Sequence, residues 1–410
     1  MREMKDSGIE WIGKIPKEWG IVKFKYLHNG LNTGEAIDKE YWESDAGPNA
    51  FYTAGLTPIR TGYSNFPTWK ETGENDLLLA RNGTPYVYLP VSKAYYTDHI
   101  IRAAMSRHVN RRFIRYCLQQ SIASIVVDSV SIPTWSATLW NNQILTWPSA
   151  IEQERIAAFL DAECAEIDAV LEKTRASIEE YKKLKQAVIT QAVTKGIRGD
   201  RPMKDSGIEW IGDIPAEWDV LNLVAHTSML TPMRDRPENL DGPIPWVRIE
   251  DFEGKYIESS KAGLGVSMKT VKEMNLKVYP VGTILCTSSC IMGKCAIVSR
   301  ELVSNQRFIG IIPDQTTDKT YLYYLMTSNA ERMNFLSTGA LQANLSRSAF
   351  EHLKVQFPPY SEQQEIAAYL DDKCEKIDEL ILKKQQYLIE IENYKKSLIY
   401  EYVTGKKEVV

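Results

Sequence analysis

Cysteine and histidine are scarce in this chain of 410 residues, which holds six cysteines and five histidines. The cysteines show no paired spacings, which argues against a disulfide framework and is typical of a reducing cytoplasm. No apolar run reaches the roughly 18 residues that a membrane-spanning helix needs. The N-terminal stretch, MREMKDSGIEW, has no apolar signal-peptide core. We therefore expect a cytoplasmic protein with no membrane partner.

Catalytic motifs are also missing. No Gly-x-x-x-x-Gly-Lys-Ser/Thr loop for a nucleotide occurs in the sequence. FPPY (357–360) approaches the motif of amino methyltransferases, but its first residue, Phe357, cannot accept a hydrogen bond from a target amine. A cluster of three cysteines lacks a fourth ligand at a spacing typical of zinc, so buried strand cysteines are the simpler interpretation. The sequence thus predicts a binding protein without a metal or cofactor of its own. The three cysteines are Cys286, Cys290 and Cys295.

What the chain does contain is an internal repeat. MKDSGIEWIGKIPKEW (4–19) returns as MKDSGIEWIGDIPAEW (203–218), with fourteen of sixteen residues identical. Its glycines and proline favour turns, and its tryptophans supply buried area. We interpret this peptide, called the clip below, as an element that docks a neighbouring domain. A surface for a partner protein is the alternative, with Trp11, Trp19, Trp210 and Trp218 as the candidate contacts.

A second repeat lies downstream of each clip. EQERIAAFLDAECAEIDAVLEK is followed 210 residues later by EQQEIAAYLDDKCEKIDELILK. In both copies apolar or small residues recur in alternating steps of four and three, which is typical of a coiled-coil seam. Neither copy contains Gly or Pro before Gly196 and Gly405, where a helix would end. We predict two long helices that pair antiparallel. The seam positions are Leu160, Cys164, Ile167, Leu171, Thr174, Ile178, Tyr181, Lys185, Val188 and Ala192, then Leu370, Cys374, Ile377, Ile381, Lys384, Leu388, Ile391, Lys395, Leu398 and Tyr402.

Two blocks, 20–150 and 219–360, lie between the clips and the helices and share little sequence. They carry 12 Lys and Arg against 10 Asp and Glu, and 15 against 14, so neither is the strongly basic footprint of stand-alone DNA binding. In the first block, DLLLARNGTPYVYLP (76–90) predicts a hairpin around Asn82-Gly83. GTILCTSSCIMGKCAIV (282–298) occupies the corresponding place in the second. We interpret the blocks as two domains of one fold that recognise different things.

The predicted fold class is α+β. Two mixed α/β domains are held apart by two long antiparallel coiled-coil helices, with internal pseudo-twofold symmetry. Each block should also contain a shorter helix, over 112–121 in the first and 320–336 in the second. The predicted domains are the first clip and block (1–150), the central helix (151–196), the linker with the second clip and block (197–360), and the C-terminal helix (361–410).

The duplicated KDSGIEWIGxIPxEW clip, the PPxxEQxxIAxxLDxxxxxID helix starts and the YKK-rich helices resemble the specificity subunits of Type I restriction-modification systems, over essentially the whole chain. The resemblance implies two target-recognition domains, each for one half of a split site in double-stranded DNA. It implies helices that set the spacing and dock two methyltransferase subunits. It further implies that S-adenosylmethionine binds to those partners, which methylate adenine, and that ATP and Mg serve restriction subunits, which can join the complex. One added heptad, about 10 Å, would lengthen the gap by about three base pairs.

Side-chain chemistry suggests which loop residues contact bases. Arg and Lys favour guanine, Asn and Gln favour adenine, and Ser and Thr serve either. An ordinary solvated surface position is the alternative for each of them. The candidates are Arg60, Lys70, Arg81, Asn82, Thr84 and, as a packing contact, Tyr86 in the first block, and Arg234, Arg236, Ser288, Ser289, Lys294 and Gln342 in the second.

Four lysines on the long helices are candidates for partner docking, with a solvated coiled-coil face as the alternative. They are Lys182, Lys183, Lys395 and Lys396. Two other functions compete with DNA recognition. One is a coiled-coil adaptor between proteins, without DNA binding. The other is a self-contained methyltransferase, which would have to bind S-adenosylmethionine on this chain.

Overall fold

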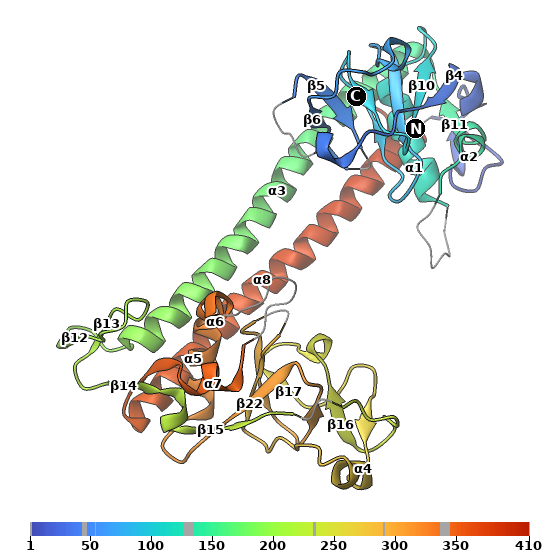
Figure 1. Ribbon diagram of the computed structural model, residues 1–410. Coiled ribbons are helices and arrows are strands. Elements are labelled where there is room, and N and C mark those ends of the chain that lie inside the picture. Colours follow the sequence, from blue (N-terminus) through green and yellow to red (C-terminus); the bar gives the residue numbers. More distant parts are fainter. Residues whose placement is uncertain are drawn as a thin grey trace. The chain divides into compact units, whose positions relative to one another are not determined.

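The computed structural model describes residues 2–42, 47–53, 55–125, 134–232, 235–289, 292–336 and 345–409. The chain divides into two compact units, each drawn in Figure 1 with parts of the two long helices. Unit 1 comprises Met1–Arg175 and Gln386–Val410, and unit 2 comprises Ala176–Gln385. Each unit therefore combines one clip, one block, the start of one long helix and the end of the other.

The long helices are α3 (Ala150–Lys195) and α8 (Tyr360–Val403). Both end within a residue or two of the glycines that the sequence marks as stops, Gly196 and Gly405, which have φ of +74° and +70°. All twenty predicted seam positions are buried or half-buried, so the prediction of a 4-3 seam is confirmed. Among the described residues, no helix combines the length and apolar character needed to cross a membrane.

Ion pairs across the seam give the direction of the helices within each unit. In unit 1, Lys395 pairs with Asp168 at 2.6 Å. In unit 2, Lys185 pairs with Asp378, also at 2.6 Å. A second pair in each unit, Arg175 with Glu392 at 2.6 Å and Arg198, just after α3, with Glu365 at 2.8 Å, shows that residue numbers rise along one helix as they fall along the other. The helices therefore run antiparallel in both units. The pairs also explain why Lys185 and Lys395, two of the three seam lysines, stand where an apolar residue is usual.

The two clips fold alike. In the first, β1 (Met4–Asp6) pairs antiparallel with β2 (Lys14–Pro16). In the second, β12 (Met203–Asp205) pairs with β13 (Asp213–Pro215). Both use the same turn, in which a glycine with φ of +70° donates its N–H to the Asp side chain two residues earlier, at 2.9 Å. The near-identity of the peptides thus reflects one local structure made twice.

The described residues of the unit 1 block form three groups of strands and two short α-helices. Its main sheet has the order β4-β10-β7-β8, a smaller one the order β6-β5-β9, and β3 pairs with β11. The main sheet packs on α1 around a core that includes Leu77, Leu79 and Phe113. The elements are η1 (Phe24–Tyr26), η2 (Lys39–Tyr41), η3 (Thr68–Lys70), β3 (Gly20–Lys23), β4 (His28–Thr33), β5 (Asn49–Tyr52), β6 (Ile59–Thr61), β7 (Asp76–Ala80), β8 (Val87–Tyr88), β9 (Tyr95–Tyr96), β10 (Ile100–Met105), β11 (Ile144–Trp147), α1 (Arg111–Ala123) and α2 (Ala137–Asn141).

The block of unit 2 repeats this topology with unrelated residues. Its main sheet has the order β15-β22-β19-β20-β17, the smaller one the order β18-β16-β21, and β14 pairs with β23. Among the described residues of unit 1, no strand corresponds to β17 and no α-helix to α4 or α6. The elements are η4 (Leu223–Ala225), η5 (Ile249–Asp251), β14 (Asp219–Asn222), β15 (Thr227–Leu230), β16 (Ile244–Val247), β17 (Tyr256–Ile257), β18 (Gly265–Val266), β19 (Ile284–Thr287), β20 (Cys295–Val298), β21 (Val303–Ser304), β22 (Phe308–Pro313), β23 (Lys354–Phe357), α4 (Met268–Glu273), α5 (Lys319–Ser328), α6 (Ala330–Leu336) and α7 (Arg347–Glu351).

Two local predictions need correction. The helix predicted over 320–336 is broken at Asn329, because the side-chain amide of Asn329 bonds the carbonyl of Leu325 and ends α5 there. The hairpin predicted over 76–90 forms, but its turn is wider than a two-residue Asn-Gly turn. Pairing stops where Ala80 N–H bonds the Tyr86 carbonyl, so several residues project beyond the strands. The helix predicted over 112–121 is confirmed as α1.

Candidate nucleic-acid interface

The loop between β7 and β8 is pinned at two points of its backbone. Arg81 N–H donates to the carbonyl of His99 at 2.9 Å, and Trp135 N–H donates to the carbonyl of Arg81 at 2.6 Å. The Trp135 indole also donates to the carbonyl of Gly83 at 2.7 Å. Asn82 bonds the His99 ring at 2.8 Å, and Arg81 is exposed, with its guanidinium 3.5 Å from the carbonyl of Asp98. The tip is therefore a supported projection that presents polar side chains to solvent.

The loop between β19 and β20 is pinned in the same way. Ser288 N–H donates to the carbonyl of Arg307 at 2.8 Å, and Leu345 N–H donates to the carbonyl of Ser288 at 2.9 Å. Ser288 thus takes the structural place of Arg81, and Arg307 takes that of His99. Lys294, on the returning side of the loop, is exposed. Equivalent hairpins in the two units hence carry different side chains.

The remaining candidate residues of unit 1 differ in exposure and in the contacts that their side chains make within the unit. Arg60 is exposed, although its guanidinium donates to the carbonyl of Pro48 at 2.9 Å. Lys70 donates to the carbonyl of Gly34 and pairs with Glu35 at 2.7 Å, and only 12% of its side chain is exposed. This geometry makes Lys70 a brace for the loop before β5 and disfavours the predicted base contact.

Two further candidates lie on the first hairpin. Thr84 is exposed at its tip. Tyr86 is half-buried, and its ring centroid lies 5.9 Å from that of Tyr88, as a packing contact requires. Thr84 can reach a ligand directly, whereas Tyr86 supports the strand beneath it.

The candidate residues of unit 2 also differ in exposure. Arg236 is exposed, with its guanidinium 5.8 Å above the ring of Trp246. Ser289 is only 7% exposed, which leaves it little surface for a base and disfavours the prediction. Arg234 and Gln342 lie outside the described residues.

The structure adds two residues to the candidate interface. His99 and Arg307 precede β10 and β22 and are both exposed beside the hairpin tips. The sequence carries a signal for them, because a polar patch follows each predicted hairpin, Asp98-His99 in the first block and Asn305-Gln306-Arg307 in the second. Strand pairing between β7 and β10, and between β19 and β22, brings these patches to the tips.

The cysteines of the second hairpin are buried partners and not an exposed site. Cys286 and Cys295 face each other across β19 and β20, with their sulfurs 2.7 Å apart. Burial and the neighbouring thiol raise the pKa of Cys286 well above its usual range, so the thiol stays protonated. Cys290 lies outside the described residues. Within the described part of the chain, no group of three or more His, Cys, Asp or Glu side chains could hold a metal ion.

The inner tryptophan of each clip lies against the start of a long helix. Trp218 is fully buried, and its indole donates to Glu362 at 3.0 Å, while Arg201 pairs with the same carboxylate at 2.5 Å. In unit 1, Trp19 and Arg2 contact Glu152 equivalently. These tryptophans are interior contacts, which supports the interpretation of the clip as a packing element.

The outer tryptophans are less buried. Trp11 is half-buried against the unit 1 core. Trp210 is 43% exposed, and the guanidinium of Arg332 lies 3.9 Å from its ring centroid. Trp210 is therefore the most exposed of the four clip tryptophans and the one most available to a partner.

Three of the four candidate lysines have contacts within their own unit. Lys395 pairs with Asp168 across the seam, and Lys182 pairs with Glu179 one turn away at 2.8 Å. The backbone carbonyl of Lys396 accepts a bond from the side chain of Gln120 at 3.1 Å. Lys182, Lys183 and Lys396 are exposed, so their charges remain accessible. Lys395 acts mainly in helix pairing.

The two blocks have one topology, and each presents a supported hairpin with different side chains, so the duplicated frame carries two different candidate interfaces. Residues 219–393 match the family described as the Type I restriction modification DNA specificity domain. This match covers less than half of the chain and shows that this part of it is similar to the DNA specificity domains of type I restriction-modification systems.

Relatives in the archaeon Methanocaldococcus jannaschii resemble parts or most of the chain. The MjaIX specificity subunit is 35% identical over 44% of this chain, an alignment that spans 43% of that protein, less than half of its length. The putative MjaX specificity subunit is 25% identical over 85% of this chain and 74% of that protein. A solved structure from work on the assembly of a type I R-M system has the same fold. It has a TM-score of 0.71 and 14% identity, and the match covers 96% of this chain and 99% of that one.

Proposed function

We propose that this chain is the DNA sequence-specificity subunit of a type I restriction-modification complex. Each block recognises one half of a bipartite site in double-stranded DNA, and the chain itself is not catalytic. The observation that carries the proposal is the pair of equivalent hairpins. They have equivalent backbone supports in both blocks, but one tip carries the exposed Arg81 and half-buried Asn82 and the other the half-buried Ser288 and exposed Lys294. One fold with exchanged tip chemistry is what two different half-sites require.

The partners in this proposal are two methyltransferase subunits, docked on the long helices. Those subunits bind S-adenosylmethionine and methylate adenine, and restriction subunits that use ATP and Mg can join them. Exposed lysines of the helices, Lys182, Lys183 and Lys396, are available for such contacts. This division of labour agrees with the near-neutral charge of both blocks, since partner subunits would supply much of the phosphate grip and this chain mainly the base contacts.

The test is adenine-methylation mapping. The chain is co-expressed with its neighbouring methyltransferase gene in a methylation-deficient host, and modified bases are read across the genome. We expect a split motif of two short half-sites around a fixed run of unspecified bases. A complex that forms and binds S-adenosylmethionine, yet methylates no split motif, would favour a protein–protein adaptor instead.

A further inference from the structure

In both units a tyrosine of the block donates its hydroxyl to an aspartate of a long helix. Tyr116 donates to Asp161 of α3 at 2.8 Å, and Tyr324 donates to Asp371 of α8 at 2.7 Å. Each tyrosine is the sixth residue of its helix, α1 or α5. Both tyrosines are almost completely buried, at 2% and 3% exposure. The contact is thus made twice, at the same place of the fold.

The aspartates of this contact belong to the repeated part of the sequence, whereas the tyrosines belong to the divergent blocks. Asp161 and Asp371 are the aspartates of the duplicated IAxxLD motif, so they belong to the repeated frame. Tyr116 and Tyr324 come from blocks that share little sequence. A tyrosine therefore stands at the same position of two divergent blocks, where it meets a carboxylate of the repeated frame.

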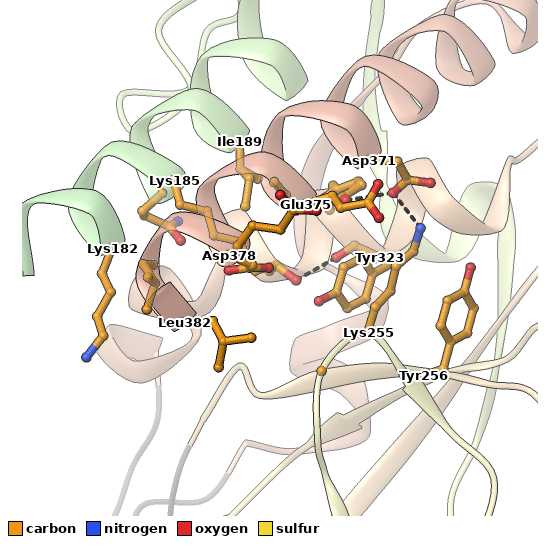
Figure 2. A pocket seen from close by; sticks show the side chains of 17 residues that line it. Lys182, Lys185, Ile189, Lys255, Tyr256, Tyr323, Asp371, Glu375, Asp378 and Leu382 are labelled. Atoms are coloured by element: carbon orange, nitrogen blue, oxygen red, sulfur yellow. Dashed lines mark hydrogen bonds and ion pairs between the residues drawn. The ribbon is translucent and has the colours of Figure 1, made fainter. Parts of the chain in front are cut away.

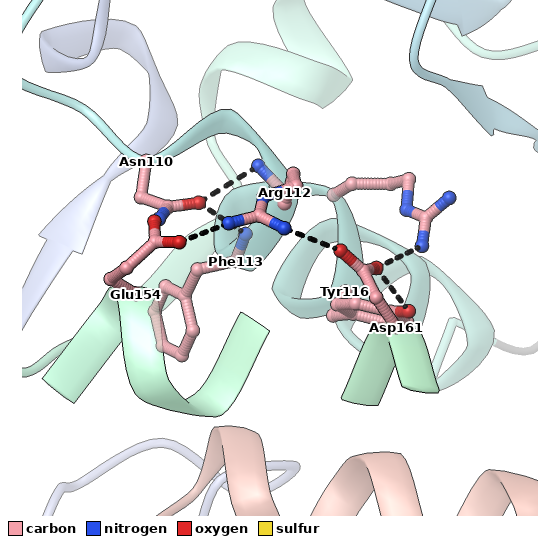
Figure 3. A network of polar contacts seen from close by, with 7 residues as sticks. Asn110, Arg112, Phe113, Tyr116, Glu154 and Asp161 are labelled. Atoms are coloured by element: carbon pink, nitrogen blue, oxygen red, sulfur yellow. Dashed lines mark hydrogen bonds and ion pairs between the residues drawn. The ribbon is translucent and has the colours of Figure 1, made fainter. Parts of the chain in front are cut away.

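The cations around the two carboxylates differ. In unit 1, Arg112 contacts Asp161 at 3.0 Å and Arg115 contacts it at 3.3 Å, both from α1 (Figure 3). Arg112 also pairs with Glu154, about two turns before Asp161 on α3. Asn110, the N-cap of α1, donates to that same Glu154 carboxylate at 2.6 Å. Helix α1 is thereby held to α3 at two points along its length.

In unit 2 the cation comes from a loop and not from α5. Lys255, just before β17, pairs with Asp371 at 2.5 Å, as Figure 2 shows. The contact lies in the wall of a cavity of about 830 Å³, where the ammonium group of Lys255 is also 5.4 Å from the ring centroid of Tyr324. The carboxylate and the tyrosine are therefore the same in both units, whereas the cation that pairs with the carboxylate comes from a different element in each. The carboxylate of the long helix is the constant part of this contact.

The chemistry suits a positioning contact. Burial, and in smaller part the bond to the carboxylate, raise the pKa of both tyrosines, which keeps the hydroxyl protonated as a donor; in unit 1 Arg115 partly opposes the shift. A hydrogen bond from a hydroxyl to an ionised carboxylate is short and directional. The ion pairs of the flanking cations hold the same carboxylate from other sides. Such a set of bonds fixes the rotation of the block's helix on the frame, which apolar packing alone fixes less strictly.

We propose that Asp161 and Asp371 are positioning residues that set the orientation of each recognition block on its long helix, and through it the gap length accepted between the two half-sites. This inference rests on the proposed function. Neither aspartate contacts DNA in the proposal; each acts through the tyrosine and cations that hold the block.

The test uses the complete complex with its methyltransferase subunits and the site found by methylation mapping. Synthetic duplexes carry that site with its native gap, or with one base pair added or removed. The variants are Asp161→Asn and Asp371→Asn, which keep the size of the side chain and remove its charge. We expect the preference for the native gap over the altered gaps to fall about tenfold, as for loss of a hydrogen bond to a charged group.

The matched controls are Asp372→Asn, next to Asp371 but paired only with Lys376 on the same helix at 2.6 Å, and Glu166→Gln, an exposed residue of α3. Both should keep the native preference. A merely structural role would instead lower methylation at all gaps in equal proportion. That outcome, or an unchanged preference in folded Asp161→Asn and Asp371→Asn complexes, would overturn the inference.

Two gentler variants cover the case in which an aspartate variant does not fold. Tyr116→Phe and Tyr324→Phe remove one hydroxyl each and retain the ring in the core. They should relax the gap preference in the same direction but less, because the cations still hold the carboxylate. If the wild-type complex methylates no split site, the proposed function itself fails; if it does and all four variants keep its gap preference, only this inference fails.

Discussion

Units 1 and 2 use the same contacts between clip and long helix but bury them to different degrees. In unit 2, Glu362 has 2% of its side chain exposed and its partner Arg201 has 10%. In unit 1 the equivalent Glu152 and Arg2 have 21% and 26% exposed. The hairpin tips, by contrast, share backbone supports and differ in side chains. In the frame, the two units have the same residue types in contact but differ in how much water reaches them. In the blocks, the two units have the same backbone geometry but differ in the side chains at the surface.

The largest effect expected from this comparison is at the two glutamates. Glu362→Ala removes the buried carboxylate partner of Arg201, which keeps only the more exposed Glu217 at 3.1 Å, and removes the acceptor of the Trp218 indole. We therefore expect a loss of about 3 kcal/mol in the free energy of unfolding. Glu152→Ala should lose only about 1 kcal/mol, because water solvates its partner. Urea denaturation of the full chain, with hydrogen exchange to assign the unit that opens, measures both. Equal losses would contradict the comparison.

The bases of the two hairpins provide the next contrast. Unit 1 pairs Leu79 with Val87 where unit 2 pairs Cys286 with Cys295. Leu79→Ala should lower the free energy of unfolding by about 2–5 kcal/mol, since the side chain is fully buried and leaves a cavity. Cys286→Ala removes a single heavy atom and should lose about 1 kcal/mol, near the value of one buried methylene. Thermal unfolding of both variants decides; a larger loss for Cys286→Ala would show that the thiol pair has a role beyond packing.

The sequence predicts the frame better than the blocks, and the reason is physical. A 4-3 pattern and two stop glycines specify α3 and α8 because a helix is determined locally, by its own residues. The clip is also local, with its turn closed by Asp6 and Gly8 within one peptide. Two equivalent stripes require a pairing but allow either direction, so the antiparallel prediction depended on a twofold axis across the helices.

The candidate interface depends on contacts that sequence patterns do not specify. Whether Lys70 is free or committed to Glu35 depends on a loop 35 residues away. The burial of Ser289 depends on the packing of its sheet, and the approach of His99 to Asn82 on strand pairing between β7 and β10. The Tyr116–Asp161 contact joins a block helix to the frame across 45 residues, where no shared period connects the two partners.

Substitutions at the hairpin tips should change which DNA sequence is selected and have little effect on folding. Arg81→Ala should weaken discrimination at one half-site by about 1–3 kcal/mol, and Lys294→Ala should do so at the other, with each leaving the opposite half unchanged. Methylation mapping of each complex measures this. Lys269→Ala is the control for Lys294, because Lys269 is an exposed lysine whose ion pair with Glu273 stays within α4. Loss at both half-sites from one substitution would break the assignment of one block to one half.

The smallest expected effect is a pH dependence confined to the clip of unit 1. Burial alone would raise the pKa of Glu152, but the hydrogen bond and charge of Arg2, with bonds from Trp19 and Ser149, outweigh it and leave the pKa below its usual value. The pair therefore contributes stability above the unfolded-state pKa of about 4.3, and that contribution is lost as the pH falls through the lower, folded-state pKa. Because both side chains are partly solvated, the change should be only a few tenths of a kcal/mol. Comparing the acid slope of unfolding for wild type and Glu152→Gln isolates it: the variant should be flatter below about pH 4. A parallel slope would mean that Arg2 finds its solvation in water in both states, and that the clip of unit 1 is held by Trp19 and its apolar neighbours alone.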